Sequence, residues 1–223
     1  LNSKLLFKKY AVQYFKESQS VLEIGPTGYP SYYSELVDMP SLEWHTLDIG
    51  EKYIGKGHAN PLHIVSEDEY HYPIADNTFD IVLSGQVMEH VRNIWLWVDE
   101  LKRITRDNGH IIIISPVSWH YHEAPVDCWR IYPEGMKALM QEKGIRIIEC
   151  CFESLEKDFF NSRVKTHPGN SILDMEGGMP LRWKIIALSH CIPILNKLFR
   201  RVPVSFDNIC VGQKSNDGRH LQE

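Results

Sequence analysis

The stretch Ser20-Val-Leu-Glu-Ile-Gly-Pro-Thr-Gly28 decides the fold of this 223-residue chain. Its apolar part ends at Ile24 and is followed by a Gly-Pro-Thr-Gly sequence, which predicts a buried strand that enters a tight turn. Pro30 fits the first turn of a helix that continues to about Val37. The order of strand, glycine turn and helix indicates the first unit of an α/β sheet.

Six further apolar runs predict strands along the rest of the chain. They are 43–47, 64–65, 78–84, 110–115, 145–152 and 207–211. Helical patterns occur around 5–16, 86–106 and 133–143. Strands that alternate with helices favour a parallel sheet covered on both faces, in a single domain over 1–223. The segment 154–203 is predicted to be an insertion before the last strand, serving as a lid, a substrate subdomain or an oligomer surface such as a homodimer contact.

Composition excludes several classes of protein. Twenty-four Lys and Arg against 29 Asp and Glu give a net charge of −5, and no basic stripe is present, so DNA is not expected as a partner. Five cysteines without a C-x-x-C pair indicate a reducing, cytoplasmic compartment and no zinc ribbon. The chain starts at Leu1 instead of Met, so we expect a trimmed chain or one domain of a larger polypeptide.

Ligands of parallel sheets bind beyond the carboxyl ends of the strands, where Gly25, Gly28 and Asp48 are expected. A carboxylate such as Asp48 can accept both hydroxyls of a ribose. The turn lacks a third glycine, and Pro26 removes a backbone donor that a pyrophosphate would need. A nucleoside cofactor without phosphates is therefore favoured. An NAD-dependent oxidoreductase and a non-catalytic nucleoside-binding module are the alternatives.

Together with 72–82 and Gln86-Val-Met-Glu-His-Val91, these motifs resemble the class I S-adenosylmethionine-dependent methyltransferases, type 11 branch, over roughly 21–152. The resemblance implies a Rossmann-like, doubly wound, seven-stranded, mostly parallel sheet with helices on both faces and a final antiparallel hairpin. S-adenosyl-L-methionine would be the methyl donor and S-adenosyl-L-homocysteine the product. By position, the resemblance implies these donor-binding residues: Glu23, Gly25, Gly28, Asp48, Asp68, Glu69, Ser84 and Gln86. Asp48 would hold the ribose and Asp68 the adenine amino group.

A sulfonium methyl is already activated, so such an enzyme aligns its acceptor and, for a hydroxyl, removes a proton. The segment 118–130 follows the fifth predicted strand and is the densest polar and aromatic cluster of the chain. It predicts His120 or His122 as the general base, with His90 as the alternative. The predicted acceptor-binding residues are Trp119, Asp127, Trp129 and Arg130. The competing interpretation is that these residues only pack the loop and cap helix ends.

A divalent metal site is a further hypothesis. Gln86, Glu89 and His90 have i, i+3 and i+4 spacing, so they share one face of the predicted 86–106 helix. With His122 or His120 folded over them, Glu89, His90 and His122 would be the metal ligands. The alternative is a metal-free enzyme in which a histidine acts alone.

A sugar or glycan hydroxyl is the predicted acceptor, which makes the chain an O-methyltransferase acting on a carbohydrate. Trp119 and Trp129 offer apolar faces for a sugar ring, while Asp127 and Arg130 offer hydrogen bonds. A small metabolite and RNA are the alternative acceptors. Residues 181–201 mix apolar and basic side chains, which favours a buried lid or dimer contact over an interfacial membrane helix.

Overall fold

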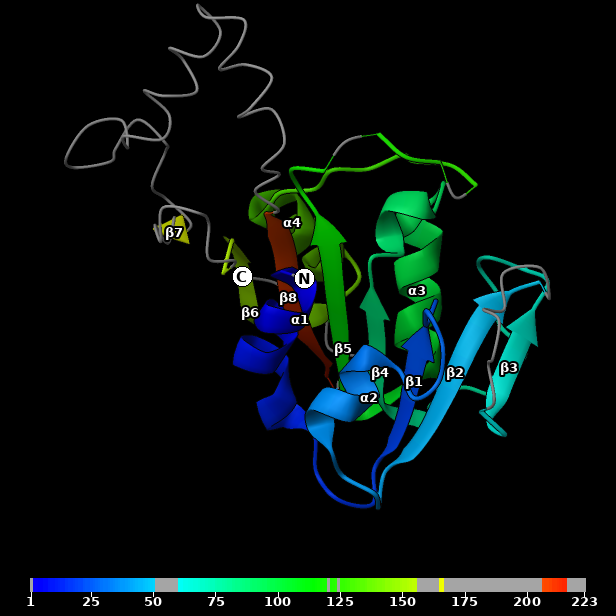
Figure 1. Cartoon of the computed structure of the whole chain (residues 1–223). Helices are drawn as coiled ribbons and strands as arrows, with labels where there is room; N and C mark the ends of the chain where they lie inside the picture. The colour runs from blue at the N-terminus through cyan, green and yellow to red at the C-terminus, as the bar shows by residue number, and fades with distance from the viewer. Residues whose placement is uncertain are drawn as a thin grey trace, which may run out of the picture.

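The computed structural model describes residues 2–50, 60–119, 121–123, 125–155, 165–166 and 206–215. They form one sheet with the strand order β3-β2-β1-β4-β5-β8-β6-β7 (Figure 1). The strands are β1 (Ser20–Ile24), β2 (Glu43–Ile49), β3 (His63–Ser66), β4 (Phe79–Gly85), β5 (Thr105–Pro116), β6 (Ile145–Glu153), β7 (Lys165–Thr166) and β8 (Asp207–Lys214). All seven predicted strands are present, and β7 adds two residues at the edge.

The direction of the strands also agrees with the prediction. Strands β3, β2, β1, β4 and β5 are parallel to their neighbours in this part of the sheet. Strand β8 inserts antiparallel between β5 and β6. The predicted doubly wound, mostly parallel sheet with a final antiparallel hairpin is therefore confirmed.

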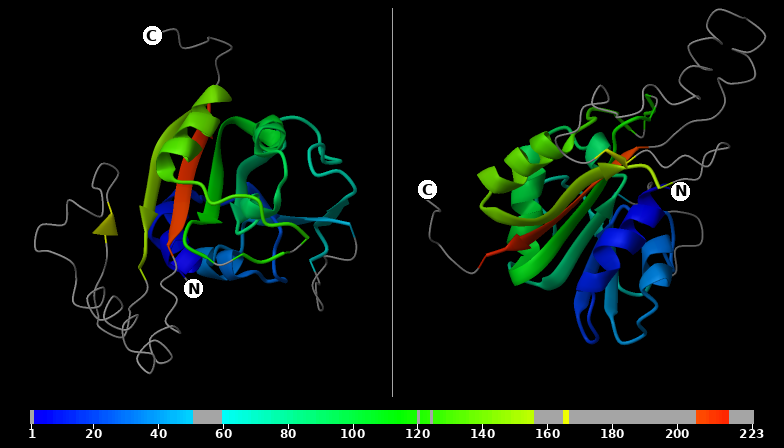
Figure 2. Two further views of the ribbon diagram at one scale, coloured as in Figure 1. Left: turned by 90° about the horizontal axis from the view of Figure 1, so that it is seen from above. Right: turned by 90° about the vertical axis from the view of Figure 1, so that its left-hand side faces the viewer.

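Helices cover both faces of the sheet, as Figure 2 shows in its right-hand view. On one face lie α1 (Asn2–Leu6), which continues through η1 (Phe7–Ala11) and η2 (Val12–Tyr14), and α2 (Tyr32–Val37). On the other lie α3 (Ile94–Ile104) and α4 (Pro133–Glu142). Successive side chains of a strand point to opposite faces. In β5, accordingly, Ile112 and Ile114 pack with the first group, whereas Ile111 and Ile113 pack with the second.

The predicted helix over 86–106 is wrong in its extent. A short 3-10 turn, η4 (Met88–His90), comes first, and α3 begins only after Asn93, whose side chain accepts a hydrogen bond from the Leu96 amide at 3.2 Å. The helix ends at Ile104 and β5 follows at once. Asn-Gly pairs often end helices, but Asn108-Gly109 lies inside β5, where the register against β4 shifts. Asn108 adopts a positive φ of 63° there, so the pair marks an irregularity of the strand.

The strand order reverses at β1, which lies between β2 and β4. At such a switch point the loops leave the sheet in opposite directions, and a crevice opens beyond the carboxyl ends. Of the predicted insertion 154–203, only 154–155 and 165–166 are described, so its predicted role and that of 181–201 lie outside the described residues. Among the helices of the described part, none is long and apolar enough to cross a bilayer. The four described cysteines are free thiols.

Candidate functional site

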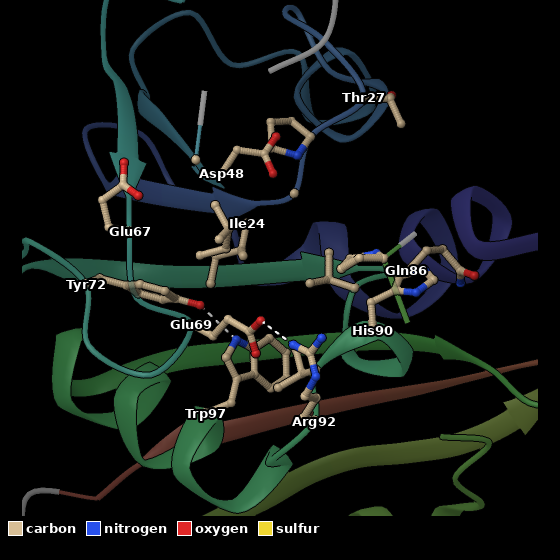
Figure 3. A pocket seen from close by; sticks show the side chains of 17 residues that line it. Ile24, Thr27, Asp48, Glu67, Glu69, Tyr72, Gln86, His90, Arg92 and Trp97 are labelled. Atoms are coloured by element: carbon tan, nitrogen blue, oxygen red, sulfur yellow. Dashed lines mark hydrogen bonds and ion pairs between the residues drawn. The ribbon is translucent and has the colours of Figure 1, made fainter. Parts of the chain in front are cut away.

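A cavity of about 720 Å³ lies at this switch point (Figure 3). Its wall comes from the segments that follow β1, β2, β3 and β4, together with Pro125 from the loop after β5. The lining residues that carry polar or aromatic side chains are Thr27, Asp48, Glu67, Glu69, Tyr72, Gln86, His90, Arg92 and Trp97. The cavity therefore occupies the place where the sequence predicts the cofactor.

The turn after β1 brings backbone close to this cavity. Gly25 has a φ of +67°, and its amide donates a hydrogen bond to the Leu47 carbonyl at 2.8 Å. A Cβ at Gly25 would lie 2.4 Å from the Val87 Cγ2 atom, so no other residue fits without displacement. Gly28 does not line the cavity, and a Cβ there would meet no atom within 4 Å. Of the two predicted glycines, only Gly25 is thus required by the geometry.

Glu23 lies below the turn and outside the cavity wall. Its buried carboxylate accepts hydrogen bonds from the Ser31 hydroxyl and from the Trp44 indole nitrogen, the latter at 2.9 Å. Ser31 is also the N-cap of α2, because its hydroxyl accepts the Ser34 amide at 3.1 Å. Burial raises the pKa of Glu23 to about 7, and these two hydrogen bonds only partly offset the effect. The Glu23 carboxylate therefore links β1 to β2 through Trp44 and to the start of α2 through Ser31.

Asp48 lies in the cavity wall at the end of β2, as predicted. Burial raises the pKa of its carboxyl to about 6, against a smaller opposing effect of the Ile49 backbone amide. The group is still largely ionised at neutral pH. It can accept hydrogen bonds from hydroxyl groups of a ligand in the cavity.

The acidic residues after β3 differ from the prediction. Asp68, the predicted adenine ligand, does not line the cavity. Its carboxylate accepts the backbone amides of Tyr70 and His71 at 2.7 and 3.1 Å, which closes the turn. Glu69, which was also predicted to bind the donor, does line the cavity, together with Glu67, and it forms an ion pair with Arg92 at 2.9 Å. Glu67 is a wall residue that the sequence reasoning missed.

The segment after β4 supplies the next part of the wall. Ser84 is completely buried, and its hydroxyl has no hydrogen-bond partner among the described residues. Gln86 lines the cavity in a left-handed conformation with a φ of 60°. Its amide donates to Asp207 at 3.2 Å, and the other oxygen of Asp207 accepts the Asn2 side chain at 2.7 Å. Gln86 is thus held by Asp207 of β8, which is itself bound to Asn2 of the first helix.

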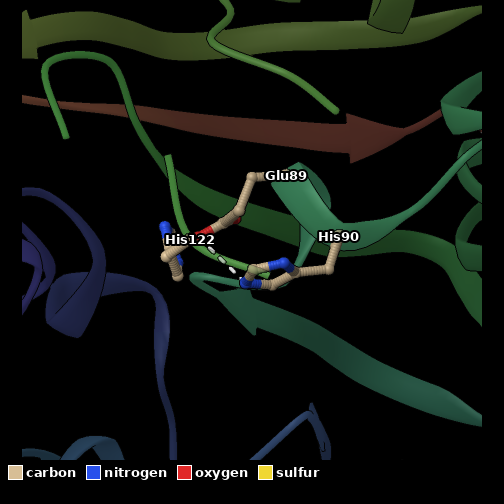
Figure 4. Close-up of side chains that lie close together, drawn as sticks. All are labelled: Glu89, His90 and His122. Atoms are coloured by element: carbon tan, nitrogen blue, oxygen red, sulfur yellow. Dashed lines mark ion pairs between the residues drawn. The ribbon is translucent and has the colours of Figure 1, made fainter. Parts of the chain in front are cut away.

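Glu89, His90 and His122 form a cluster next to the cavity (Figure 4). His90 lies in the cavity wall, and the His122 ring meets it edge-on, with 5.0 Å between ring centroids. Glu89 is buried, and burial raises its pKa to about 7. The predicted helix face shared with Gln86 does not exist, because Gln86 precedes η4. The cluster forms nevertheless, since the loop after β5 brings in His122.

The loop after β5 uses most of its predicted acceptor residues for its own contacts. Asp127 forms a two-point ion pair with Arg130, with oxygen–nitrogen distances of 2.5 and 2.7 Å, and this guanidinium lowers the pKa of Asp127 well below its usual range. The Trp129 indole donates to the Val91 carbonyl at 2.7 Å. Trp119 is 37% exposed. None of these four residues lines the cavity, and His120 lies outside the described residues.

Comparison with known proteins agrees with this geometry. Residues 22–113 match the family described as "Methyltransferase domain". An uncharacterized methyltransferase of Schizosaccharomyces pombe is 29% identical over an alignment 117 residues long, which covers 46% of this chain and 41% of that protein. The chain therefore spans less than half the length of this curated relative.

Two solved structures extend the likeness to nearly the whole chain. A SAM-dependent methyltransferase from Archaeoglobus fulgidus has a TM-score of 0.59 at 21% identity, over 95% of this chain and 92% of that one. The phosphoethanolamine N-methyltransferase 2 of Haemonchus contortus, solved in complex with S-adenosyl-L-methionine, has a TM-score of 0.53 at 12% identity, over 96% and 52% of the two chains. At these identities the likeness shows the fold. Together with the family match, it confirms the resemblance stated from the sequence, and S-adenosylmethionine is the expected cofactor.

Proposed function

We propose that the chain transfers the methyl group of S-adenosylmethionine to a hydroxyl of a sugar or glycan, a proposal supported by the match of residues 22–113 to the methyltransferase domain family. The observation that carries the donor side of this proposal is the charge of the cavity wall. Three lining carboxylates, Asp48, Glu67 and Glu69, face one guanidinium, Arg92, which is already paired with Glu69. An acidic wall favours a sulfonium cation and disfavours the pyrophosphate of a dinucleotide.

In the reaction, the hydroxyl oxygen attacks the methyl carbon in line with the departing sulfur. The new O–CH₃ bond forms while the S–CH₃ bond breaks, its electron pair stays on sulfur, and the hydroxyl proton passes to a neighbouring imidazole or to water. The chain's contribution is to hold donor and acceptor in this alignment. Asp48 would hold the ribose, and the acceptor would react beside His90, the predicted catalytic histidine that lies in the wall.

The acceptor class rests on the loop after β5. Its exposed Trp119 offers an aromatic face on which the apolar side of a sugar ring can pack. Pro125 of the same loop reaches the cavity. A carbohydrate docked on this loop can therefore present a hydroxyl to the cavity.

The donor site is tested by calorimetric titration with S-adenosylhomocysteine and, separately, with NAD. We expect binding of the first and none of the second. Asp48→Asn should weaken binding about 10- to 100-fold, because it replaces a charged hydrogen-bond acceptor worth about 1.5–3 kcal/mol. Asp38→Asn, at the exposed C-terminal end of α2, is the matched control and should bind like the wild type. Preferential binding of NAD would contradict the proposal.

The acceptor is tested by transfer of a labelled methyl group into separated glycans, small metabolites, protein and RNA. Label in glycans supports the proposal. Label in metabolites or RNA would contradict the glycan acceptor but support the methyltransferase activity. S-adenosylhomocysteine binding without label in any fraction would favour a non-catalytic nucleoside-binding module.

A further inference from the structure

We infer that Glu89, His90 and His122 bind a divalent first-row transition-metal ion beside the acceptor end of the cavity. One ligand atom from each residue lies within 4.8 Å of the other two (Figure 4). The inference deepens the proposed function, on which it rests, because the ion would hold the acceptor oxygens. Its support comes from the contacts of the three side chains.

The Glu89 carboxylate is the strongest of these observations. The residue is 1% exposed, and neither carboxylate oxygen has a hydrogen-bond partner among the described residues. The His90 Nε2 atom is 3.8 Å away, which is too long for a hydrogen bond. A buried carboxylate without a hydrogen-bond partner is costly, and protonation would only add a buried O–H donor that also needs an acceptor. A cation bound at this carboxylate removes the cost.

His90 has the tautomer that a metal ligand needs. Its Nδ1 atom lies 2.5 Å from the Val126 carbonyl oxygen, which can only accept, so Nδ1 carries the proton. In the neutral imidazole Nε2 is then free to bind a metal, and it is on the side of Glu89. A backbone carbonyl bound to the other ring nitrogen is a common way to orient a histidine that ligates a metal.

His122 is oriented by a carboxylate in a comparable way. Its Nδ1 atom is 3.4 Å from Asp127 Oδ2, and its backbone amide donates to the same oxygen at 2.8 Å. Asp127 is itself fixed by the two-point pair with Arg130. A carboxylate, a histidine and then a metal form a known outer-shell arrangement. The predicted acceptor residues Asp127 and Arg130 therefore gain a role as positioning residues for His122.

The donor set selects the class of ion. Imidazole nitrogens are good ligands for first-row transition ions, and a carboxylate oxygen is a good ligand for Mn²⁺. In contrast, Mg²⁺ and Ca²⁺ prefer sites made only of oxygen ligands. Donors bound about 2.1 Å from one ion lie about 3 to 3.5 Å apart, so binding draws the three side chains together by about an ångström. With three protein ligands, positions remain open for two oxygens of a sugar. An ion there lowers the pKa of a bound hydroxyl.

The test is a Mn²⁺ titration of the chelator-treated full chain, followed by the electron paramagnetic resonance signal of free Mn²⁺. We expect one Mn²⁺ per chain, retained in excess Mg²⁺. Loss of even an outer-shell partner lowers metal affinity about 10- to 100-fold. Glu89 and His122 would bind the ion directly, so Glu89→Gln and His122→Asn should each weaken Mn²⁺ binding at least about tenfold. Glu123→Gln removes an exposed carboxylate from the same loop and should bind like the wild type. Unchanged affinity for S-adenosylhomocysteine shows that each variant is folded.

Two results would overturn the inference: no Mn²⁺ bound by the wild type, or equal binding by Glu89→Gln and the wild type. Methyl transfer that survives exhaustive chelation would also overturn it, and would leave His90 as the general base. Failure of the proposed function is distinguishable, because Mn²⁺ binding to this cluster without methyl transfer to any acceptor would contradict only the methyltransferase proposal.

Discussion

Replacing Glu23 by glutamine should make the stability of this protein less dependent on pH. The carboxyl is buried below the β1 turn, and burial raises its pKa to about 7. Because the folded pKa lies above the unfolded one, the folded state holds the proton more tightly. The stabilisation is therefore complete below the unfolded pKa of about 4.5 and is lost as the pH rises to about 7.

The size of the effect follows from these two pKa values. A carboxyl whose pKa rises from about 4.5 to about 7 on folding lowers the free energy of unfolding by about 2 to 3 kcal/mol between pH 5 and pH 8. Glutamine has nearly the same shape, and its side-chain oxygen can still accept the Trp44 indole proton. It has no proton to lose in this range. The variant should therefore lack this share of the decrease.

Urea unfolding followed by tryptophan fluorescence at pH 5 and pH 8 measures the effect. The quantity of interest is the difference in free energy of unfolding between the two pH values, compared between Glu23→Gln and the wild type. Glu35→Gln, an exposed change on α2, is the control and should behave like the wild type. Glu89, also raised to a pKa of about 7 by burial, adds its own decrease to all three proteins and cancels in the comparison. A Glu23→Gln protein with the wild-type pH dependence, within about 1 kcal/mol, would refute the reasoning.

Two further changes test the cavity wall. Gly25→Ala should lower the free energy of unfolding by at least about 1 kcal/mol and weaken S-adenosylhomocysteine binding, because its Cβ would collide with the Val87 side chain and its φ is positive. Gly28→Ala has open space around the new Cβ, so it should change neither property in thermal-shift and calorimetric measurements. Asp207→Asn should lower the free energy of unfolding in urea by about 1–3 kcal/mol, because an amide group that donates to Asp207, from Asn2 or Gln86, then faces an NH₂ group; wild-type stability would show that these hydrogen bonds are dispensable.

The strands of this protein were predictable because buried parallel strands are continuous apolar runs. That Glu23 and Ile24 point to opposite faces was also predictable from the sequence, whereas the structure shows that Ile24 is the one that lines the cavity. Side chains alternate along a strand, and Ile24 lines the cavity, so Glu23 must point to the opposite face, toward Trp44. The family resemblance predicted that Glu23 binds the cofactor, whereas the alternation of side chains along β1 points it away from the cavity.

The acidic stretch after β3 shows where local sequence is not sufficient. Glu67, Asp68 and Glu69 are three consecutive carboxylates, and any of them could face the ligand. The outcome depends on the turn, in which Asp68 accepts two backbone amides, as short Asp side chains often do. Glu67 and Glu69 are then left for the cavity wall. The Asp before an exposed turn was a signal for this arrangement, but only the folded turn decides it.

The acceptor loop could not be predicted in detail, because its residues contact a segment 36 to 39 residues earlier. The Cys128 amide donates to the Glu89 carbonyl at 2.7 Å, the Trp129 indole donates to Val91, and the Val126 carbonyl accepts His90. These three contacts fasten the loop after β5 to the turn after β4.

The contacts between the loop after β5 and the turn after β4 limit how the site can change. Val126, one of the residues that fix the loop, also orients His90, and the neighbouring Asp127 orients His122, so movement of the loop would disturb the cluster beside the cavity. The cavity-wall residues at and after the ends of β1, β2 and β3 lie on other segments. We therefore expect acceptor preference to vary through exposed loop positions such as Trp119, which make few of these contacts, while substitutions at Asp127 or Trp129 affect catalysis with every acceptor.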